Sequence, residues 1–505
     1  MTQPPAGGRA LSEIMAERRR RAEALGASGH PPWGQDFSPT LSCASAAQLV
    51  PKEPGALGQE ARLAGRILRL RSSGGVAFAD LNDSSGSLQL LAARDAPEGD
   101  MVQELALLDL GDIVGAEGRL LRSRRGEPSL QLSRLTLLAK ALRPPADKVR
   151  GLTDLEQRYR RRHLEWLSDP RRRDIFRRRG AVIQALRRVL DQRGYLEVET
   201  PVLQAIPGGG SARPFRTHHH SLGQDLFLRI ALELHLKRLL VGGFDRAYEL
   251  GRVFRNEGLS PRHNPEFTLL EAYEAYGNLN SMKELCQALV LAAVEAGATA
   301  DAESVEATRE LHPPFPSRPM AALVAEATVL DWDGLWAEPA RLASELQDQH
   351  VQLEPGLSSG QMLFAAYEQL IEPRLTEPVF VTDYPVEVSP LARLGPDPRF
   401  VERFELVAQG RELANAFSEL NDPVEQRRRL LEQARLREGG DLEAQPFDED
   451  FVQALEQGMP PAGGIGIGVD RLVMLVTGAK SIREVVLFPT LRSGAPEGDD
   501  TDAAG

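Results

Sequence analysis

The sequence contains few cysteines and no long apolar run. Its two cysteines, Cys43 and Cys286, are too few for a disulfide framework or a cysteine-rich zinc site, and they fit a reducing cytosol. No apolar segment approaches the roughly 20 residues that span a bilayer, and none follows the basic residues near the N-terminus. We therefore expect neither a membrane protein nor a signal peptide, and a cytoplasmic location.

The sequence also lacks a strong positive charge and the common phosphate-binding motifs. A formal net charge of −12 excludes a general polycation, so any nucleic acid must meet local basic patches. No Walker A sequence is present, and the spacing of Gly464, Gly466 and Gly468 does not match a dinucleotide fingerprint. The 505 residues still allow two or three domains, and 42% hydrophobic and 26% charged residues are ordinary for a globular protein.

Changes in residue pattern predict four regions. Residues 1–55 form an N-terminal helical extension, whose run of arginines is at least as well explained by a solvated helix face as by a nucleic-acid contact. Residues 56–145 carry about five short strands and one helical stretch, which favours a five-stranded OB-type Greek-key β-barrel, although a purely structural barrel fits this pattern equally. Residues 146–492 form a large α+β domain, and residues 493–505 form a disordered acidic tail.

The large domain begins with an amphipathic pattern. Apolar residues at helical spacing predict a helix over Ile175–Arg193, which Gly194 ends, and a strand over Tyr195–Thr200. Residues 279–365 are predicted to be mostly helical and carry little polar signal.

The stretch from Phe254 to Tyr273 is the most informative part of the chain. It predicts two extended segments joined by a polar loop, and a period of two places Arg255 and Glu257 on one face of the first and Glu271 and Tyr273 on one face of the second. Such a face suits a nucleotide phosphate, an adenine ring and a charged small molecule. The alternative is a solvated antiparallel face, but Asn, His, Pro and Phe lie between the charges in place of the usual Lys, Glu and Thr.

A second hairpin is predicted around Gln409 and Gly410. It would bring Glu405 and Glu412 close together, and two facing carboxylates repel unless a cation lies between them. Mg²⁺ bridging nucleotide phosphates is the natural occupant, and an ion pair with Arg403 or Arg411 is a real alternative. Beyond the turn, the next polar and aromatic positions share one face, namely Asn415, Phe417 and Glu419.

The glycines at 464, 466 and 468 predict a strand with one bare face. A flat ligand can approach such a backbone closely, although close packing against a neighbouring strand is the alternative. The chain then turns into a helix that starts near Asp470 and Arg471, and a guanidinium there can stack on a base and reach a terminal phosphate. His218–His220 is better explained as a polar loop end than as a metal site, and Gly208–Gly210 modestly favours a loop that closes over a ligand.

These motifs together resemble a known family. Gly194–Pro201, Phe254–Glu257 and Gly464–Arg471 resemble, in order, the three signature motifs of class II aminoacyl-tRNA synthetases. The surrounding segments are similar to lysyl-tRNA synthetases over roughly residues 10–492, and they are Gly151–Asp154, Ile206–Phe215, Leu236–Leu239, Tyr384–Leu391 and Phe417–Asp422. The resemblance implies an antiparallel-sheet catalytic domain, a homodimer with Ile175–Pro201 at its interface, and the joining of L-lysine to tRNA-Lys at the expense of ATP.

The resemblance also implies roles for single residues. Arg255 and Arg471 are the implied catalytic residues, Glu257, His263 and Phe267 join them in binding ATP, and Glu405 and Glu412 bind ATP through Mg²⁺. The implied lysine-binding residues are Gly209, Glu233, Glu271, Tyr273, Asn415, Phe417 and Glu419. On the barrel, the implied anticodon-binding residues are Arg71, Phe78, Gln89 and Glu127. An ammonium on an aliphatic stem is satisfied by an aromatic wall ending in a carboxylate, which Tyr273, Phe417 and Glu419 supply.

The chain departs from the family pattern at a few positions. Leu232 and His235 replace the usual proline and tyrosine around Glu233, Gly75 stands where a lysine is common, and Asn278–Asn280 follows the second motif where an acidic residue is usual. None removes an implied ligand, although Gly75 favours weaker anticodon binding.

Three other functions fit parts of the sequence. A paralogue that modifies proteins would usually lack the barrel, and a non-catalytic tRNA-binding module would not retain the charged residues above. An aspartyl relative would need a cation where Glu419 stands.

Overall fold

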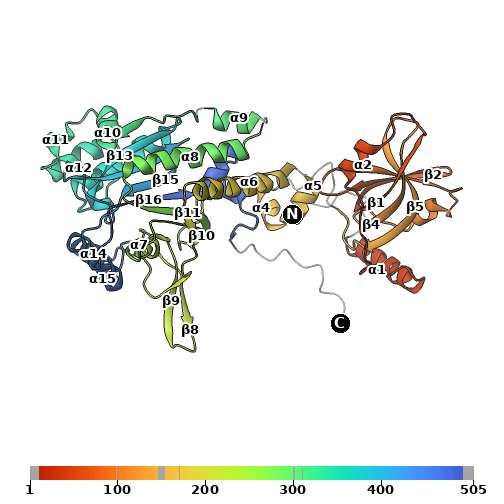
Figure 1. The fold of residues 1–505 in the computed structure, drawn as a ribbon, viewed down its shortest axis with the longest axis horizontal. Coiled ribbons are helices and arrows are strands. Elements are labelled where there is room, and N and C mark those ends of the chain that lie inside the picture. Colours follow the sequence, from red (N-terminus) through yellow and green to blue (C-terminus); the bar gives the residue numbers. More distant parts are fainter. Residues whose placement is uncertain are drawn as a thin grey trace. The chain divides into compact units, whose positions relative to one another are not determined.

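The chain folds into two compact units, which Figure 1 shows in a computed structural model. The structure describes residues 11–97, 99–145, 154–169, 171–299, 302–309 and 311–492. One unit contains residues up to Arg158 together with His163–Ser168, and the other contains Tyr159–Arg162 and Asp169–Arg492. The predicted tail at 493–505 and most of the connector after Ala141 lie outside the described residues.

The smaller unit is built around a closed five-stranded barrel with the strand order β1-β2-β3-β5-β4. Its strands are β1 (Leu57–Ser73), β2 (Val76–Asn82), β3 (Ser87–Ala93), β4 (Ile113–Arg122) and β5 (Pro128–Ala139). All neighbours pair antiparallel except β3 and β5, which pair parallel. Alternate residues of β2 point inward, so that Ala77, Ala79 and Leu81 are buried in the barrel core. The sequence prediction of five strands with one helix, α3 (Met101–Ala106), is confirmed.

Two helices before the barrel belong to the same unit. α1 (Leu11–Ala27) contains Arg18, which is 7% exposed and donates to the carbonyl oxygens of Leu110 and Ala141 at 3.0 and 2.9 Å. One residue of the predicted arginine run is therefore part of the packing between α1 and the barrel. The sequence prediction missed α2 (Cys43–Leu49), which is short and capped by Ser42.

The larger unit is built on an eight-stranded, mainly antiparallel sheet with the order β12-β13-β14-β15-β16-β11-β10-β6. Only the two outermost pairs, β12 with β13 and β6 with β10, run parallel. The strands are β6 (Leu196–Glu197), β10 (Arg246–Phe254), β11 (Glu266–Ala275), β12 (Ser317–Pro319), β13 (Val379–Pro385), β14 (Phe400–Ala408), β15 (Arg411–Ser418) and β16 (Ala462–Gly468). A separate small sheet contains β7 (Leu203–Gln204), β8 (Arg216–His219) and β9 (Gln224–Leu228).

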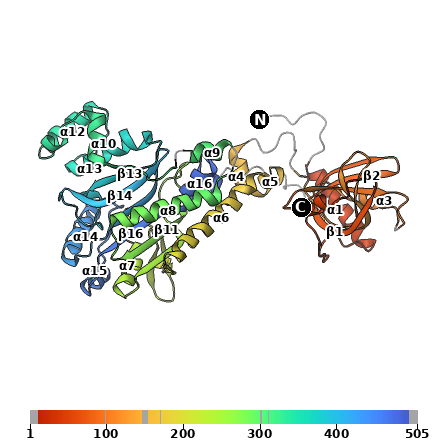
Figure 2. The ribbon, with the colours of Figure 1, turned by 45° about the horizontal axis from the view of Figure 1, so that its top comes forward.

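A layer of helices covers one face of the large sheet, and the cavity described below opens on the other face, which further helices cover only in part. α6 (Arg171–Gln192) and α8 (Leu279–Gly297) lie side by side along the sheet (Figures 1 and 2), and α16 (Val469–Thr477) packs against both. Leu270, Ile465 and Ala416 point into this layer, where a large buried cluster forms the main core. The predicted helix at Ile175–Arg193 is thus confirmed as α6.

The described part of residues 279–365 is mostly helical, as predicted. After α8 it contains α9 (Ala302–Thr308), α10 (Met320–Thr328), α11 (Trp332–Leu335), α12 (Pro339–Asp348) and α13 (Ser359–Ala366). Elsewhere in this unit lie α7 (Glu233–Val241), α14 (Pro423–Glu438), α15 (Glu449–Glu456) and α17 (Ile482–Val485), together with short π- or 3-10 helices at Tyr367–Ile371, Glu372–Arg374 and Val386–Val388.

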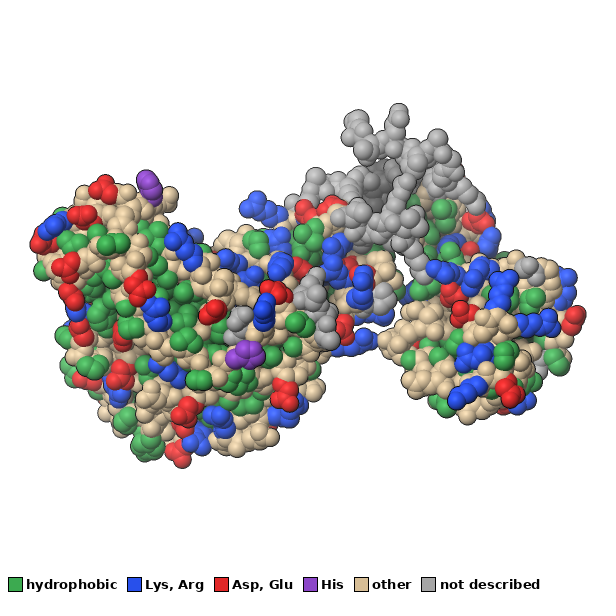
Figure 3. Space-filling view, turned by 90° about the horizontal axis from the view of Figure 1, so that it is seen from above, with side chains coloured by type: hydrophobic (Ala, Val, Ile, Leu, Met, Phe, Trp, Pro, Cys, Tyr) green, Lys and Arg blue, Asp and Glu red, His purple; other side chains and the backbone are tan. Residues whose placement is uncertain are grey.

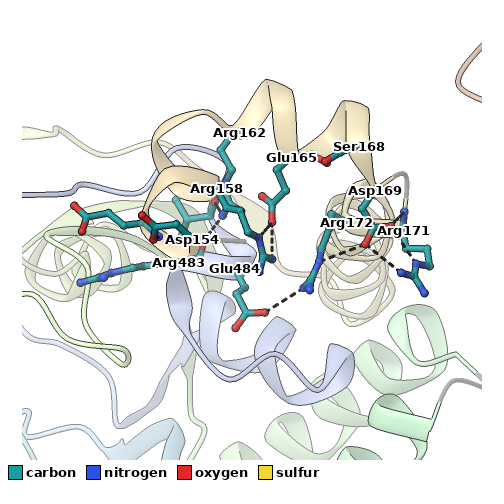
Figure 4. A network of polar contacts seen from close by, with 12 residues as sticks. Asp154, Arg158, Arg162, Glu165, Ser168, Asp169, Arg171, Arg172, Arg483 and Glu484 are labelled. Atoms are coloured by element: carbon teal, nitrogen blue, oxygen red, sulfur yellow. Dashed lines mark hydrogen bonds and ion pairs between the residues drawn. The ribbon is translucent and has the colours of Figure 1, made fainter. Parts of the chain in front are cut away.

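The segment with α4 (Leu155–Arg160) and α5 (Arg162–Ser168) is divided between the units. Within the smaller unit, Arg158 pairs with Glu165 at 2.7 Å, and within the larger unit Arg172 lies 3.7 Å from Glu484 (Figure 4). On the face seen in Figure 3, basic and acidic side chains are interspersed over the larger unit. Among the described residues, no helix combines the length and hydrophobicity needed to cross a membrane.

Two strand predictions were wrong in extent. The strand predicted over Tyr195–Thr200 pairs only at Leu196–Glu197, because this stretch lies at the sheet edge with one neighbour. β10 ends at Phe254, so that Arg255 and Glu257 lie beyond the strand and not on one face of it. Arg255 still bonds to the segment before β11, since its backbone N–H donates to the carbonyl oxygen of Pro265 at 2.8 Å.

Candidate active site

A cavity of about 190 Å³ opens on the sheet face opposite α6, α8 and α16. Its floor consists of alternate residues of neighbouring strands, which share a face because side chains in a strand alternate. They are Phe267, Leu269, Glu271 and Tyr273 from β11, Gly464, Gly466 and Gly468 from β16, and Asn415 and Phe417 from β15. A second cavity of about 450 Å³ shares several lining residues with the first, including Glu233, Arg255 and Glu412.

Two glycines of β16, Gly466 and Gly468, leave the floor bare, whereas Gly464 corresponds to the alternative of close packing. A Cβ atom on Gly464 would lie 2.0 Å from Oε1 of Glu419 and 2.5 Å from Cε1 of Tyr273, far inside van der Waals contact. A Cβ atom on Gly466 would lie 3.7 Å from Cγ of Glu271, which is an ordinary contact. Close packing therefore requires glycine at 464, whereas at 466 and 468 glycine leaves room on the cavity side.

Carboxylates from three elements gather at one end of the cavity. Glu233 begins α7, Glu271 lies on β11, and Glu419 follows β15, and each is no more than 7% exposed. Gly209, at φ +82°, allows the preceding loop to approach α7, since its Cβ position would lie 3.0 Å from Cβ of Glu233. This end of the cavity is suited to a ligand that carries more than one positive charge.

Glu271 is held in place from two sides. Oε1 accepts from the backbone N–H of Leu232 at 3.1 Å, and Oε2 accepts from the hydroxyl of Tyr273 at 3.0 Å. Burial, reinforced by the nearby carboxylate of Glu233, raises the pKa of Glu271 to about 8. The hydroxyl of Tyr273 therefore donates a hydrogen bond to Glu271, a contact that the sequence did not predict.

Glu419 is buried beside the floor of the cavity. Oε1 lies against the cavity-side face of Gly464, 2.0 Å from the position of a Cβ atom there, and Oε2 is 2.5 Å from Nζ of Lys237 on α7. Among the described residues, neither carboxylate oxygen has a hydrogen-bond partner. A buried carboxylate oxygen without a partner is costly, and a cationic ligand would remove this cost.

The other end of the cavity combines cations with an aromatic ring. The guanidinium of Arg255 lies 5.2 Å from the ring centre of Phe267, and its Nε donates to the carbonyl oxygen of Ile230 at 3.4 Å. His263 lies in the loop before β11, where Nδ1 is 2.9 Å from Oγ of Ser260, and Glu257 lines the same end. This arrangement suits a planar base with phosphates attached.

Arg471 is placed by the start of α16. Its Nη1 donates to Glu412 twice, to the carbonyl oxygen at 2.9 Å and to Oε2 at 3.0 Å. The neighbouring Asp470 accepts from the backbone N–H of Thr268 at 2.6 Å and from Arg179 of α6 at 2.5 Å. These buried contacts fix the first turn of α16 between β11 and α6, and so fix the origin of the Arg471 side chain.

The turn at Gln409 and Gly410 puts Glu412 on the same face as Glu405. Val407 pairs with Glu412, and Val407 shares a face with Glu405 because side chains in a strand alternate. The register then shifts between Leu406 and Val407, so that Glu405 pairs with Asn415 and Asn415 joins this face as well. The two carboxylates interact, because burial followed by the charge of Glu412 raises the pKa of Glu405 to about 7.

Both carboxylates also have arginine partners. Arg403 lies 2.5 Å from Oε1 of Glu405, which is the alternative that the sequence left open, and Arg471, in place of Arg411, pairs with Glu412. Among the residues that the structure describes, no group of three or more His, Cys, Asp or Glu side chains forms a metal cluster. A carboxylate pair on one face, in which the pKa of Glu405 is raised by burial and by the charge of Glu412, fits a cation bound jointly with phosphate oxygens.

On the barrel, the candidate nucleic-acid residues share an outer face. Phe78 of β2 lies opposite Arg71 of β1, both point away from the core, and Arg71 donates to Asp80 at 3.2 Å. Gln89 of β3 faces Asp80 and accepts from Ser129, two residues beyond the exposed Glu127. The structure therefore places Arg71, Phe78 and Gln89 together on the outer face, with Glu127 in the adjoining β4–β5 turn.

The histidine run lies apart from the cavity. His218 and His219 end β8 and His220 starts the turn to β9, and His218 is 2.8 Å from Asp225 across this exposed hairpin. This agrees with a polar loop end. Gly209 and Gly210, in contrast, line the second cavity.

Sequence reasoning missed one residue at the centre of the site. Lys237 is 0% exposed and contacts Glu233 as well as Glu419. The spacing of Glu233 and Lys237, four residues apart on a helix, could have indicated an ion pair. Its contact with Glu419 depends on the fold and has no local signal.

Comparisons with known proteins agree with this geometry. A family model described as "tRNA synthetases class II (D, K and N)" matches residues 154–492, and one described as "OB-fold nucleic acid binding domain" matches residues 61–138. A lysine–tRNA ligase of Moorella thermoacetica is 46% identical over 486 residues, covering 96% of this chain and 98% of that protein. Lysine–tRNA ligases of Synechococcus sp. (strain CC9605) and Bacillus subtilis are 48% and 45% identical, covering 97% and 95% of this chain and 99% and 98% of those proteins.

Proposed function

Because the chain belongs to the lysine–tRNA ligases of the class II aminoacyl-tRNA synthetases, we propose that the cavity on the large sheet binds L-lysine at its acidic end and ATP at its basic end. The enzyme activates lysine with ATP to lysyl-adenylate and pyrophosphate and then transfers lysine to tRNA. The observation that carries the proposed arrangement is the buried carboxylate of Glu419 beside Gly464 on the cavity floor, whose oxygens have no hydrogen-bond partner among the described residues.

At the acidic end, Glu419 receives the side-chain ammonium of lysine. Tyr273 and Phe417 form the walls along the aliphatic stem, and Asn415 lies between this stem and the nucleotide end. Glu233 and Glu271 receive the α-ammonium, and Gly209 closes the loop over it. The lysine carboxylate then points toward Arg255, where it can attack the phosphate of ATP.

At the basic end, Arg255 binds the α-phosphate and stabilises the charge that develops there during the attack. Phe267 and Arg471 hold the adenine between them, and Glu257 and His263 contact the nucleotide. Little proton transfer is needed in this step, so that alignment of the carboxylate with the phosphate and stabilisation of charge supply most of the rate.

Glu405 and Glu412 would hold Mg²⁺ together with phosphate oxygens. The ion would neutralise charge on the phosphates and orient them. The two glutamates fit this role because they lie on one face, and because burial and the charge of Glu412 raise the pKa of Glu405, which a bound cation would oppose. Arg403 positions Glu405 and also donates to Asn415 at 3.0 Å, so that it links the proposed metal and lysine residues.

The barrel carries the proposed anticodon reader. Phe78 offers a ring on which a base can stack, and Arg71, Gln89 and Glu127 can bond to base edges. The partner tRNA is tRNA-Lys in this proposal, and a cytoplasmic location follows from the need to meet tRNA and ATP.

A homodimer is proposed around Ile175–Pro201. Apolar side chains are unusually exposed at and beside this segment, including Leu196 at 50%, Leu203 at 45% and Val202 at 40%. Sedimentation analysis of the protein would give twice the chain mass of 55.4 kDa if this proposal holds. A single-chain mass at micromolar concentration would contradict it.

The proposed lysine assignment is tested by Glu419→Gln. This change removes the charge but nearly keeps the shape, so lysine should bind on the order of 100-fold more weakly. The KM for ATP should change little, as measured by lysine-dependent pyrophosphate exchange. An unchanged KM for lysine would contradict the assignment of Glu419.

A further inference from the structure

Lys237 is the least expected residue near the proposed lysine site. Its side chain is fully buried on α7, where Nζ lies 2.6 Å from Oε1 of Glu233 and 2.5 Å from Oε2 of Glu419. Nζ also lies 5.3 Å from the ring centre of Phe417. The enzyme therefore holds a lysine ammonium of its own against three of the residues proposed to recognise substrate lysine.

The charges that face Glu419 come from two elements. α7 presents Lys237 and Glu233, β11 presents Glu271 and Tyr273, and the backbone of Gly464 on β16 packs against Oε1. Burial, helped by the carboxylates of Glu233 and Glu271, raises the pKa of Glu419 above its usual value, and the ammonium of Lys237 limits this rise. The two carboxylates in turn raise the pKa of Lys237, although burial alone would lower it, so that the amine keeps its proton.

The two oxygens of Glu419 have different surroundings. Oε2 makes the ion pair with Lys237, whereas Oε1 lies against the cavity-side face of Gly464, and neither oxygen has a hydrogen-bond partner among the described residues. A carboxylate can accept from two cations at once, one on each oxygen. Lys237 thus leaves one oxygen open for a ligand.

Stability alone does not account for a lysine at this position. Removing two charges from water carries a large desolvation penalty for each ion, and apolar residues of similar volume commonly replace buried ion pairs without loss of stability. This penalty is explained if the Lys237–Glu419 ion pair prepares Glu419 to bind a charged group of the ligand.

We propose that Lys237 is a positioning residue, which holds the Glu419 carboxylate ionised and oriented so that its free oxygen can receive the side-chain ammonium of the substrate. This inference rests on the proposed role of Glu419 in lysine recognition. Without Lys237, the buried Glu419 would take up a proton in the free enzyme. Lysine would then have to displace that proton when it binds.

Calorimetric titration of the full-length protein with lysine at pH 7 tests this proposal. Titrations in two buffers with different ionisation enthalpies give the number of protons released on binding. In Lys237→Met, we expect the affinity for lysine to fall on the order of 100-fold and the proton release to increase by about one relative to the wild type. Weaker binding with unchanged proton release would show that Lys237 only fills space, and would overturn the proposal.

Arg238→Met is the matched control. It removes a cation from the same helix, but Arg238 pairs with Asp448 at 3.0 Å and is not among the residues that line the cavity. Lysine affinity and proton release should match the wild type. The same changes in both variants would indicate a general effect on α7 and would also overturn the proposal.

A variant cycle with Glu419→Gln keeps the test decisive if Lys237→Met alone does not fold. In Glu419→Gln there is no carboxylate for Lys237 to keep ionised. Adding Lys237→Met to Glu419→Gln should therefore weaken lysine binding by less than about threefold. A further loss of tenfold or more would overturn the inference. If Glu419→Gln itself leaves lysine affinity unchanged, the proposed assignment of Glu419 fails, which is a separate outcome.

Discussion

Gly464→Ala tests the geometry of the cavity floor with the smallest possible change. The added Cβ atom would lie 2.0 Å from Oε1 of Glu419 and 2.5 Å from the ring of Tyr273. Both side chains are buried, at 1% and 3% exposure, so that neither can move away freely. Forcing an extra methyl group into such packing costs about 1–3 kcal/mol.

That cost falls on the residues proposed to bind lysine. Displacing Glu419 and Tyr273 should raise the KM for lysine by roughly 5- to 150-fold, while the KM for ATP changes little because Phe267 and Arg471 lie at the other end of the cavity. Lysine-dependent pyrophosphate exchange, with each substrate varied in turn, measures both constants.

Gly466→Ala is the comparison for this prediction. Its Cβ atom would meet Cγ of Glu271 at 3.7 Å, so the free protein should keep its thermal stability, whereas Gly464→Ala should melt at a lower temperature. A KM for lysine within twofold of the wild type in Gly464→Ala would refute the geometry described for Glu419.

Three further predictions test other parts of the molecule. Burial raises the pKa of Glu271 to about 8, so its carboxyl must lose a proton to receive an ammonium, and kcat/KM for lysine should rise with pH through a midpoint near 8 and level off above it; a flat profile between pH 6 and 8 would count against this role. Phe78→Ala should weaken tRNA charging while leaving pyrophosphate exchange nearly intact, and equal losses in both assays would show that the barrel face does not read tRNA. Arg179→Met breaks the buried pair with Asp470 and should cost about 3–5 kcal/mol of stability in denaturant unfolding, whereas Arg187→Met, which breaks an exposed pair on the same helix, should cost at most about 1 kcal/mol.

The sequence revealed those parts of the fold that depend on local pattern. The barrel strands follow from short alternating segments and turn residues, and α6 follows from apolar residues at helical spacing. The bare face of β16 follows from glycine at alternate positions. Each of these signals lies within one element, so it can be read without knowledge of the neighbours.

The remaining features depend on contacts between elements. Strict alternation along β15 would place Asn415 and Phe417 on the face opposite Glu412, and only the register shift between β14 and β15 brings them to the same face. The partner of Glu412 proved to be Arg471, 59 residues away, which no local spacing indicates. The contact of Lys237 with Glu419 likewise joins α7 to the end of β15 and appears only once the sheet is assembled.

The end of β10 shows a different limit. Alternating charges at Arg255 and Glu257 look like a continued strand, but the pairing of β10 with β11 stops at Phe254 opposite Glu266. Residues from Arg255 to Pro265 then form the loop that closes one end of the cavity. Both charged residues reach the site from a loop, which alternation in the sequence could not distinguish from a strand.

The most direct test of the central claim is pyrophosphate exchange with each amino acid in turn, including norleucine and ornithine. Buried Glu419 behind walls of Tyr273 and Phe417 should accept an ammonium at the end of a four-carbon stem, so exchange should depend on lysine and be far weaker with ornithine, which is one carbon shorter, and with norleucine, which lacks the charge. Exchange supported equally by norleucine, or by aspartate or asparagine in place of lysine, would contradict the account.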